Sequence, residues 1–201
     1  MTKYSEYNLP DIQIIESEEA QIFTWVPDKA YVVLGQRDSV DKAVNDVILS
    51  KHNISVLKRP SGGHSVVLSP NTFVVAMTHP GKTIKDIKPT FTKSIDVIIR
   101  ALEMQGVRNL QIKGISDIVI GDKKITGSSM YFAKTKLFFH AVINISEKPD
   151  FIAQFLKHPE TEPEYRKKRN HSEFITSLEE QGYIININKL SEDLRTVFYD
   201  Y

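Results

Sequence analysis

The sequence contains no cysteine among its 201 residues. This absence excludes disulfide bonds, thiolate metal sites and a cysteine nucleophile. The chain also lacks an excess of either charge, because 26 Lys and Arg residues stand against 25 Asp and Glu residues. Without a net field, the chain has no general means of gathering on nucleic acid or on an anionic membrane. We therefore expect neither as a partner.

Long apolar runs are missing too. The first ten residues, MTKYSEYNLP, carry no basic region followed by an apolar stretch, and no later segment approaches the roughly 20 apolar residues of a membrane span. A cytoplasmic protein is therefore expected. Repeats and Gly-, Ser- or Pro-rich linkers are also absent, so residues 1–201 are expected to form one domain with one active site.

The pattern of elements favours an α+β fold, with a mixed β-sheet flanked by helices. Short β-type runs are expected at 12–15, 21–25, 31–34, 54–58, 65–68 and 73–77, followed by a β region at 110–145. Helices are expected at 40–50, 91–104, 150–156, 172–181 and 191–198. The helix at 91–104 places Ile95, Ile98, Ile99 and Leu102 on one face, which should pack on the sheet. Strand runs and helix runs are partly segregated, which is typical of α+β domains.

A glycine-containing loop, Arg59-Pro60-Ser61-Gly62-Gly63-His64, lies between two of the expected strands. Paired glycines allow positive φ and let a ligand approach the backbone amides, while Arg59 supplies a fork of donors for phosphate or carboxylate. The loop matches neither the Walker A pattern nor GxGxxG, and two glycines between strands often form a simple turn. By itself the loop leaves both interpretations open.

A hairpin is expected around Gly121-Asp122, a pair suited to a two-residue type II′ turn. The predicted register pairs Ile120 with Lys123, Val119 with Lys124, Ile118 with Ile125 and Asp117 with Thr126. Because faces alternate along a strand, Ile118, Ile120 and Ile125 mark the core side. Asp117 and Lys124 then share the opposite side, and Lys123 remains a surface residue beside the turn. A solvated hairpin face is the alternative interpretation.

Together, the segments KRPSGGHSVVLSPNTFVVAM (58–77) and GISDIVIGDKKITGSSMY (114–131) resemble the two signature segments of lipoate-protein ligases. That family shares a catalytic fold with biotin ligases and octanoyltransferases. Residues 33–36 and the pair Phe139-His140 support the resemblance, which extends more weakly to 169–178. Two motifs in the right order are more specific than either alone. The resemblance implies an acyl chain in a tunnel and an adenylate over the sheet.

The resemblance also assigns site residues. Lys124 matches the lysine that contacts the acyl-adenylate, where a cation can stabilise developing negative charge, and Asp117 matches the second member of an Asn-Asp pair. These two are the expected catalytic residues. The residues expected to bind the acyl group or nucleotide are Arg59, Ser61, Gly62, Gly63, His64, Gly127, Ser128, Ser129 and His140.

The activity implied by the resemblance joins lipoate, or a similar medium-chain acid, to AMP from ATP. The acyl group then passes to a lysine of a lipoyl carrier domain, as in a 2-oxoacid dehydrogenase or a glycine cleavage protein. The six histidines show no pair at metal-ligand spacing, so no structural metal is expected, although Mg²⁺ could accompany ATP. The basic run 166–169 could receive an acidic carrier domain or a phosphate, or it could be a solvated face.

Departures from the family pattern keep other functions open. His64 stands where ligases usually carry a third glycine, and Ser116 replaces the expected asparagine. We expect this chain to lack the family's opening helix and small C-terminal accessory domain, and a separate chain could supply that domain. A transferase that uses preformed acyl-adenylate, or a ligase-like binding or regulatory protein without activity, are therefore alternatives. Octanoyl transfer through a cysteine is disfavoured by the lack of cysteine, and biotin ligation by the poor match of the loop 59–64.

Overall fold

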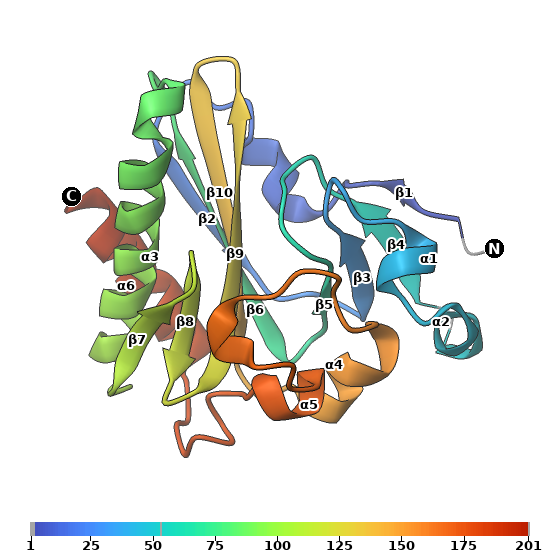
Figure 1. The fold of residues 1–201 in the computed structure, drawn as a ribbon. Coiled ribbons are helices and arrows are strands. Elements are labelled where there is room, and N and C mark those ends of the chain that lie inside the picture. The colour runs from blue at the N-terminus through green and yellow to red at the C-terminus, as the bar shows by residue number, and fades with distance from the viewer. Residues whose placement is uncertain (1–2, 53, 201) are drawn as a thin grey trace.

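Two β-sheets pack against each other in the computed structural model, which describes residues 3–52 and 54–200 (Figure 1). The larger sheet is antiparallel and comprises, in spatial order, β2 (Gln21–Trp25), β6 (Thr72–His79), β10 (Lys136–Asn144), β9 (Lys123–Ala133), β8 (Asp117–Ile120) and β7 (Leu110–Lys113). The smaller sheet is mixed and comprises β1 (Ser5–Glu6), β4 (Ser55–Lys58), β3 (Tyr31–Leu34) and β5 (Val66–Leu68). The predicted α+β class, with mixed β-structure flanked by helices, is confirmed.

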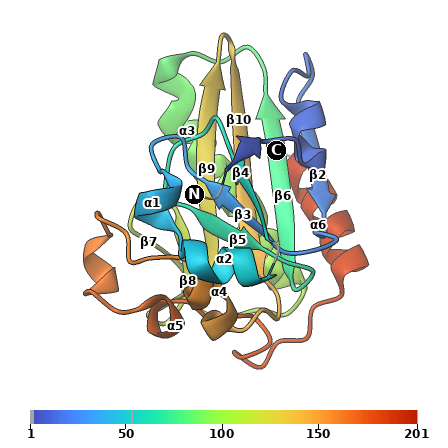
Figure 2. The ribbon, with the colours of Figure 1, turned by 90° about the vertical axis from the view of Figure 1, so that its right-hand side faces the viewer.

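Helices cover the outer faces of both sheets. The large sheet is covered by α3 (Ile87–Met104) and α6 (Ile187–Tyr199), and the small sheet by α1 (Val40–Ala43), α2 (Asp46–His52) and α4 (Pro149–Phe155) (Figures 1 and 2). The remaining helices are α5 (His171–Phe174) and three 3₁₀ turns, η1 (Pro10–Ile14), η2 (Ile84–Asp86) and η3 (Glu164–Arg166). No helix in the described part of the chain combines the length and the apolar character needed to cross a membrane.

The main core lies between the large sheet and α3. Ile95, Ile98 and Leu102 project from one face of α3 and are almost completely buried, as their spacing predicts. The ring of Phe91 meets Phe139 of β10 edge-on, with centroids 5.5 Å apart. The central strand β6 is buried along its whole length, because helices cover one of its faces and the small sheet the other.

Three predicted elements differ from the structure. The expected strand at 12–15 is wrong, because Pro10 starts the 3₁₀ turn η1 and its fixed φ favours a helical first turn. The expected helix at 40–50 is broken at Val44, which adopts an extended conformation and bridges Leu156. The expected helix at 172–181 ends after four residues, since Ile175 extends and pairs with Lys124 of β9.

Replacing Leu102 with Ala should lower the free energy of unfolding by about 2–5 kcal/mol, because Leu102 is fully buried between α3 and the sheet. Urea denaturation followed by circular dichroism measures this change. Glu103→Ala, an exposed position on the same helix, is the control and should change stability by less than about 0.5 kcal/mol. Equal effects of the two substitutions would contradict this packing of α3.

Candidate active site

A cavity of about 570 Å³ lies between the two sheets. Apolar side chains of both sheets form its inner walls, among them Val33, Leu68, Val74 and Val142. Of the eleven predicted site residues, nine line this cavity: Arg59, Gly63, His64, Asp117, Lys124, Gly127, Ser128, Ser129 and His140. The other two, Ser61 and Gly62, belong to the loop behind its wall. The structure therefore brings the two sequence motifs together around one cavity.

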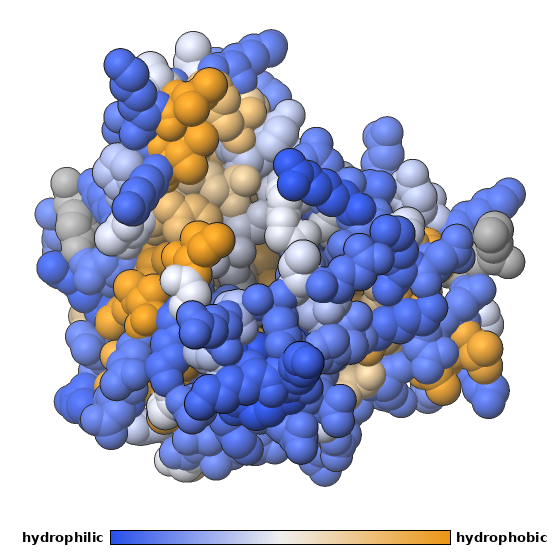
Figure 3. All heavy atoms as spheres, in the orientation of Figure 1, coloured by the Kyte–Doolittle hydropathy of each residue, from blue (hydrophilic) through white to orange (hydrophobic). Residues whose placement is uncertain are grey.

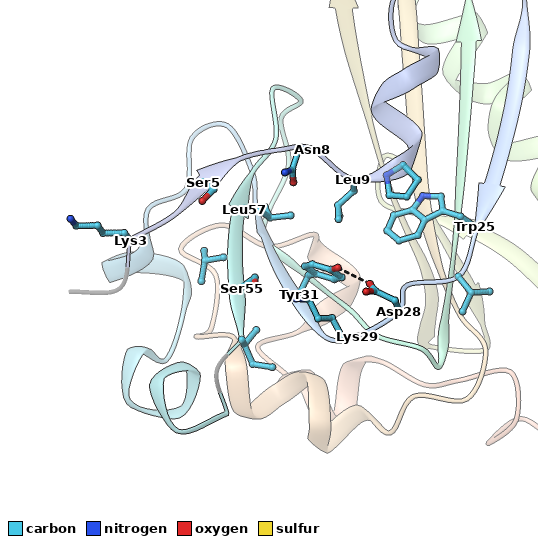
Figure 4. Close-up of a pocket in the computed structure, with 14 residues that line it drawn as sticks. Lys3, Ser5, Asn8, Leu9, Trp25, Asp28, Lys29, Tyr31, Ser55 and Leu57 are labelled. Atoms are coloured by element: carbon cyan, nitrogen blue, oxygen red, sulfur yellow. Dashed lines mark hydrogen bonds between the residues drawn. The ribbon is translucent and has the colours of Figure 1, made fainter.

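A second cavity, of about 700 Å³, contains none of the predicted site residues. Leu9, Trp25, Tyr31 and Leu57 line it, and Figure 4 shows it beside β3 and β4. These four side chains belong to the same apolar cluster as Val33, Leu68 and Val74, which line the first cavity. The cluster thus forms a wall between the two cavities. Because nine of the eleven predicted site residues line the smaller cavity, it is the candidate site.

The glycine loop is built around the guanidinium group of Arg59. This group donates to the carbonyl oxygens of Gly62 and His64, each at 2.8 Å, and to that of Val33 at 3.3 Å. Its Nε donates to Ser61 Oγ at 3.0 Å. Burial lowers the pKa of Arg59 to about 10, so the side chain stays charged at neutral pH. From the sequence, the Arg59 guanidinium group was a candidate donor to a ligand's phosphate or carboxylate. In the structure, most of its donors instead bind acceptors of the loop itself.

This arrangement leaves loop amides available. Gly63 and His64 line the cavity, and within residues 3–52 and 54–200 their backbone N–H groups donate to no protein acceptor. Gly63 adopts a left-handed φ of 79°, whereas His64 does not have a positive φ. The histidine in place of a third glycine therefore carries no backbone strain of that kind. Its Nε2 lies 3.1 Å from Thr161 Oγ1, on the opposite side of the cavity.

The Asp117–Lys124 pair is the charged centre of the site. Lys124 Nζ lies 2.6 Å from Asp117 Oδ1, and the hydroxyl of Tyr165 donates to Asp117 Oδ2 at 2.7 Å. Burial, and next the neighbouring Asp117 carboxylate, raise the pKa of Tyr165, so its hydroxyl remains a donor. Gly127 makes room for the lysine, because a Cβ at this position would lie 3.1 Å from Lys124 Nζ. The expected sharing of one space by the acid and the lysine is confirmed.

The hairpin register is only partly as predicted. Val119 pairs with Lys124 and Ile120 with Lys123, as the turn indicates, and Lys123 is exposed. A β-bulge between Ile118 and Val119 then pairs Ile118 with Thr126. The predicted pairs Ile118–Ile125 and Asp117–Thr126 are therefore wrong. A bulge inserts one extra residue in one strand and re-aims the side chains beyond it, which no turn signal reveals.

A third segment, residues 159–171, contributes groups that the sequence motifs did not identify. It crosses in front of β9 (Figure 1), and Glu162, Arg166 and His171 line the cavity. Arg166 is only 4% exposed, and its Nη2 has no hydrogen-bond partner among the described residues. The pKa of His171 is lowered to about 4, mainly because the side chain is buried. The surrounding cations lower it further, and Arg166 has the largest effect among them. His171 is therefore neutral at pH 7. The signals in the sequence for this segment were the basic run 166–169 and the weak extension of the resemblance over 169–178.

His140 and Ser128 complete the predicted set. His140 Nε2 lies 2.7 Å from Ser61 Oγ, which ties β10 to the glycine loop, and Ser129 Oγ donates to the Gly62 carbonyl at 2.8 Å. Ser128 Oγ donates to the carbonyl of Ser116, the residue that replaces the expected asparagine, at 3.2 Å. In the described part of the chain, no group of three or more His, Asp or Glu side chains is arranged to hold a metal ion.

Comparisons with known proteins bear on this site. Residues 6–199 match the family described as the lipoyl protein ligase A/B catalytic domain. The chain is 27% identical over 159 residues to lipoate–protein ligase 1 of Staphylococcus aureus, a match that covers 78% of this chain and 45% of that protein. The chain spans about half the length of the curated relatives it matches.

Solved structures share the fold. A bi-partite lipoate protein ligase of Thermoplasma acidophilum, described together with its E2 lipoyl domain, aligns with a TM-score of 0.80 and 16% identity, over 94% of this chain and 75% of that one. Lipoate-protein ligase A bound with ATP aligns with a TM-score of 0.78 and 18% identity, over 94% and 77%. At such identities the likeness demonstrates a common fold, and the chemistry has to be argued from the site.

Gly35→Ala should destabilise the protein by about 1–3 kcal/mol and displace the glycine loop, because a Cβ at Gly35 would lie 1.8 Å from the Gly63 carbonyl oxygen. Gly62→Ala is the matched control: no atom lies within 4 Å of its added Cβ, and its φ is not positive. Urea denaturation of both variants tests this prediction. If Gly62→Ala proves the less stable protein, the described approach of the loop to Gly35 is incorrect.

Proposed function

Because the chain belongs to the lipoyl protein ligase A/B catalytic-domain family, we propose that it binds lipoate, or a similar medium-chain acid, as its acyl-adenylate. We propose further that the acyl group passes to a lysine of a carrier domain. The observation that carries the proposal is the Lys124–Asp117 pair, 2.6 Å apart, in the same cavity as the free amides of the glycine loop. The acyl chain, the activated carboxyl group and the phosphate of the acyl-adenylate each suit a different part of this cavity.

The acyl chain is suited to the apolar inner walls. Val33, Leu68, Val74 and Val142 surround that part of the cavity, and each buried methylene contributes about 0.8 kcal/mol of binding free energy. Tyr7 and His140 add polar atoms at the wall. A chain of several methylenes ending in a compact ring or methyl group fits these walls better than a head group that needs many hydrogen bonds.

The activated carboxyl group belongs beside Lys124. When the acceptor amine attacks the acyl carbon, a nitrogen–carbon bond forms, AMP leaves with the electrons of the broken anhydride bond, and the nitrogen loses a proton. Negative charge grows on the carbonyl and phosphate oxygens during this step. The Lys124 ammonium group and the N–H groups of Gly63 and His64 are donors fixed before the reaction, which is how a site stabilises such charge. Asp117 orients the lysine through their ion pair.

The phosphate of the adenylate is suited to Arg166. A buried guanidinium nitrogen without a partner carries a desolvation cost that a phosphate oxygen would remove. Lys124 lies close enough to contribute to the low pKa of His171, as Arg166 does, so both cations act on the same part of the cavity. ATP is the proposed source of the adenylate, in keeping with the ATP bound to the structural relative, and Mg²⁺ is proposed only as a companion of its phosphates.

The acceptor lysine belongs to a carrier domain, as suggested by the E2 lipoyl domain of the archaeal relative. Hydrophilic side chains cover the front of the molecule over η3 and α5, and apolar side chains gather beside β7 and β8 (Figure 3). The exposed side chains there include Ile112, Ile115, Lys167 and Lys168. We propose that this mixed apolar and basic surface receives the carrier domain. A 2-oxoacid dehydrogenase or glycine cleavage protein is the candidate source.

Two alternatives concern how much of the reaction the chain performs. The protein could transfer an acyl group only from preformed acyl-adenylate, or it could bind the adenylate without reacting. Ser116 in place of asparagine is the departure that favours them, whereas the intact Lys124–Asp117 pair favours chemistry. Incubation with ATP and candidate acids, followed by mass spectrometry for acyl-adenylate, separates a full ligase from both alternatives.

Lipoyl-AMP, or a stable analogue, should bind more tightly than biotinyl-AMP, because the cavity walls are apolar and offer few partners for a ureido ring. Isothermal titration calorimetry with both ligands measures the two affinities. The reverse order would reject the lipoate assignment while leaving the fold unaffected.

Lys124→Ala should slow acyl transfer from preformed lipoyl-AMP by about 10²–10³-fold, the range for loss of one group that stabilises the transition state. The lysine is partly exposed, so the fold should survive. Lys123→Ala is the matched control, because Lys123 is the preceding residue and is exposed beside the turn. Single-turnover assays with a carrier domain compare the two variants. Equal rates for Lys124→Ala and wild type would remove the lysine from the chemistry and favour the binding-protein alternative.

A further inference from the structure

We infer that Asp11 is a positioning residue that holds the glycine loop in its ligand-binding form through His140 and Ser61. The expected effect of Asp11 on ligand binding rests on the proposed function. Its effect on His140 and on the glycine loop can be tested without any ligand. Asp11 lies in the turn η1, outside both sequence motifs, and is completely buried. Full burial of a carboxylate is costly unless polar groups compensate it, so the partners of Asp11 are informative.

The partners form a relay of three hydrogen bonds and one longer electrostatic contact, the one between Asp11 and His140. The hydroxyl of Tyr7 donates to Asp11 Oδ1 at 2.7 Å. Asp11 Oδ2 lies 3.6 Å from His140 Nδ1, and His140 Nε2 lies 2.7 Å from Ser61 Oγ. Ser61 Oγ in turn accepts from Arg59 Nε at 3.0 Å. The relay therefore joins the N-terminal segment, strand β10 and the glycine loop, which are far apart in the sequence.

The carboxylate decides which ring nitrogen of His140 carries the proton. At 3.6 Å, the Asp11–His140 contact is longer than a hydrogen bond, and Asp11 Oδ2 has no hydrogen-bond partner among the described residues. A buried negative oxygen at this distance still attracts an N–H group and repels a nitrogen lone pair. Burial keeps the pKa of His140 below its usual value, so the ring is neutral and holds a single proton. That proton belongs on Nδ1, which leaves Nε2 as an acceptor.

The direction of the relay then fixes Ser61 and Arg59. With Nε2 as an acceptor, the Ser61 hydroxyl must donate to His140, and its lone pairs face the Arg59 Nε–H group. Arg59 is thereby held where its remaining donors reach the carbonyls of Gly62 and His64. If Nε2 carried the proton instead, Ser61 Oγ would face two donors, and its own proton would lose this acceptor. Ser61 Oγ could still accept from both donors, but its buried hydroxyl proton would be left without this acceptor, which would weaken the hold on the loop that presents the Gly63 and His64 amides.

Among the described residues, the charged and titratable groups found to act on His140 or to face its ring are Asp11, Arg59 and Tyr7, which all belong to this relay. Asp11 and Tyr7 face the ring from the N-terminal segment, with the Tyr7 ring centroid 6.0 Å from that of His140. Arg59 faces it from the loop and disfavours a second proton on the imidazole. Phe138 packs on the ring from the same strand at 5.3 Å between centroids. Asp11 is the only one of these groups that attracts an N–H group to the Nδ1 side.

The first test uses the unliganded protein. Nitrogen-15 NMR of wild type should show the proton of His140 on Nδ1, and Asp11→Asn should shift the population toward the Nε2–H form, because an amide can donate to Nδ1. The amide of Gln36, which donates to the Ser61 carbonyl at 3.0 Å, reports on the loop. Its hydrogen exchange should become about tenfold faster in Asp11→Asn, the factor that corresponds to 1.4 kcal/mol. An Nε2–H ring in wild type would overturn the inference.

A matched control distinguishes a specific role of Asp11 in positioning the loop from the general effect of removing a buried carboxylate. Asp193 is 1% exposed, lies on α6 away from the cavity, and pairs with Lys189 and Gln105. Asp193→Asn should leave both the His140 proton and the Gln36 exchange rate as in wild type. Equal acceleration of Gln36 exchange in the two variants would reduce Asp11 to a purely structural residue and overturn the inference.

The second test measures the affinity for lipoyl-AMP and the rate of acyl transfer. Asp11→Asn should weaken lipoyl-AMP binding about tenfold and slow single-turnover transfer at saturation by less than about tenfold, well short of the 10²–10³-fold loss expected for Lys124→Ala, because Lys124 and Asp117 are untouched. If Asp11→Asn does not fold, Ser61→Ala interrupts the relay one step later. Ser61→Ala should accelerate Gln36 exchange while His140 keeps its proton on Nδ1, and unchanged exchange would overturn the inference. If wild type binds no lipoyl-AMP, the proposed function fails, whereas the NMR and exchange results still decide the role of Asp11.

Discussion

The buried guanidinium group of Arg59 is the constraint on which the site depends. A charge removed from water must be compensated, and here the compensation comes from the carbonyl oxygens of Val33, Gly62 and His64. Carbonyls turned toward the arginine leave the neighbouring amides free to meet a ligand. The loop thus gains its shape from one interaction, and among the described residues its Gly63 and His64 N–H groups at the cavity wall donate to no protein acceptor. Charge-assisted hydrogen bonds of this kind are about twice as strong as neutral ones, which suits a loop that must remain ordered without regular structure.

The second constraint on the site is the position of the Lys124–Asp117 ion pair, which contributes little to the stability of the fold. The Lys124–Asp117 ion pair is partly exposed, and pairs of this type stabilise a fold by about 1 kcal/mol at most. Its geometry is nevertheless determined from several sides. The bulge in the β8–β9 pairing, the missing side chain at Gly127 and the hydroxyl of Tyr165 all direct these two charges into the cavity. Strand β9 therefore acts as a rigid support for the Lys124 ammonium group.

Segments far apart in the sequence complete the cavity from opposite sides. The N-terminal segment contributes Tyr7 to its lining and Asp11 behind it, whereas the segment 159–171 contributes Arg166 and His171. Both segments meet the strands through buried polar groups as well as apolar contacts. Burial keeps His140 and His171 neutral, so the positive charge of the cavity is concentrated on Lys124, Arg59 and Arg166. The carboxylates of Asp117, Glu162 and Glu164 line the same cavity, and Asp117 is paired with Lys124.

The sequence by itself determined what local pattern can encode. Short runs of β-type residues located β2 and β3, helical spacing predicted the buried face of α3, and the Gly121-Asp122 turn predicted the pairing of Val119 with Lys124. Two motifs in order were enough to indicate the family. Tertiary structure decided the bulge, the early end of α5 and the burial of Asp11 and Arg166, because each depends on contacts with residues distant in the chain. It also decided that Arg59 faces the loop carbonyls, since a guanidinium group is a donor in any setting and only the fold determines which acceptors surround it.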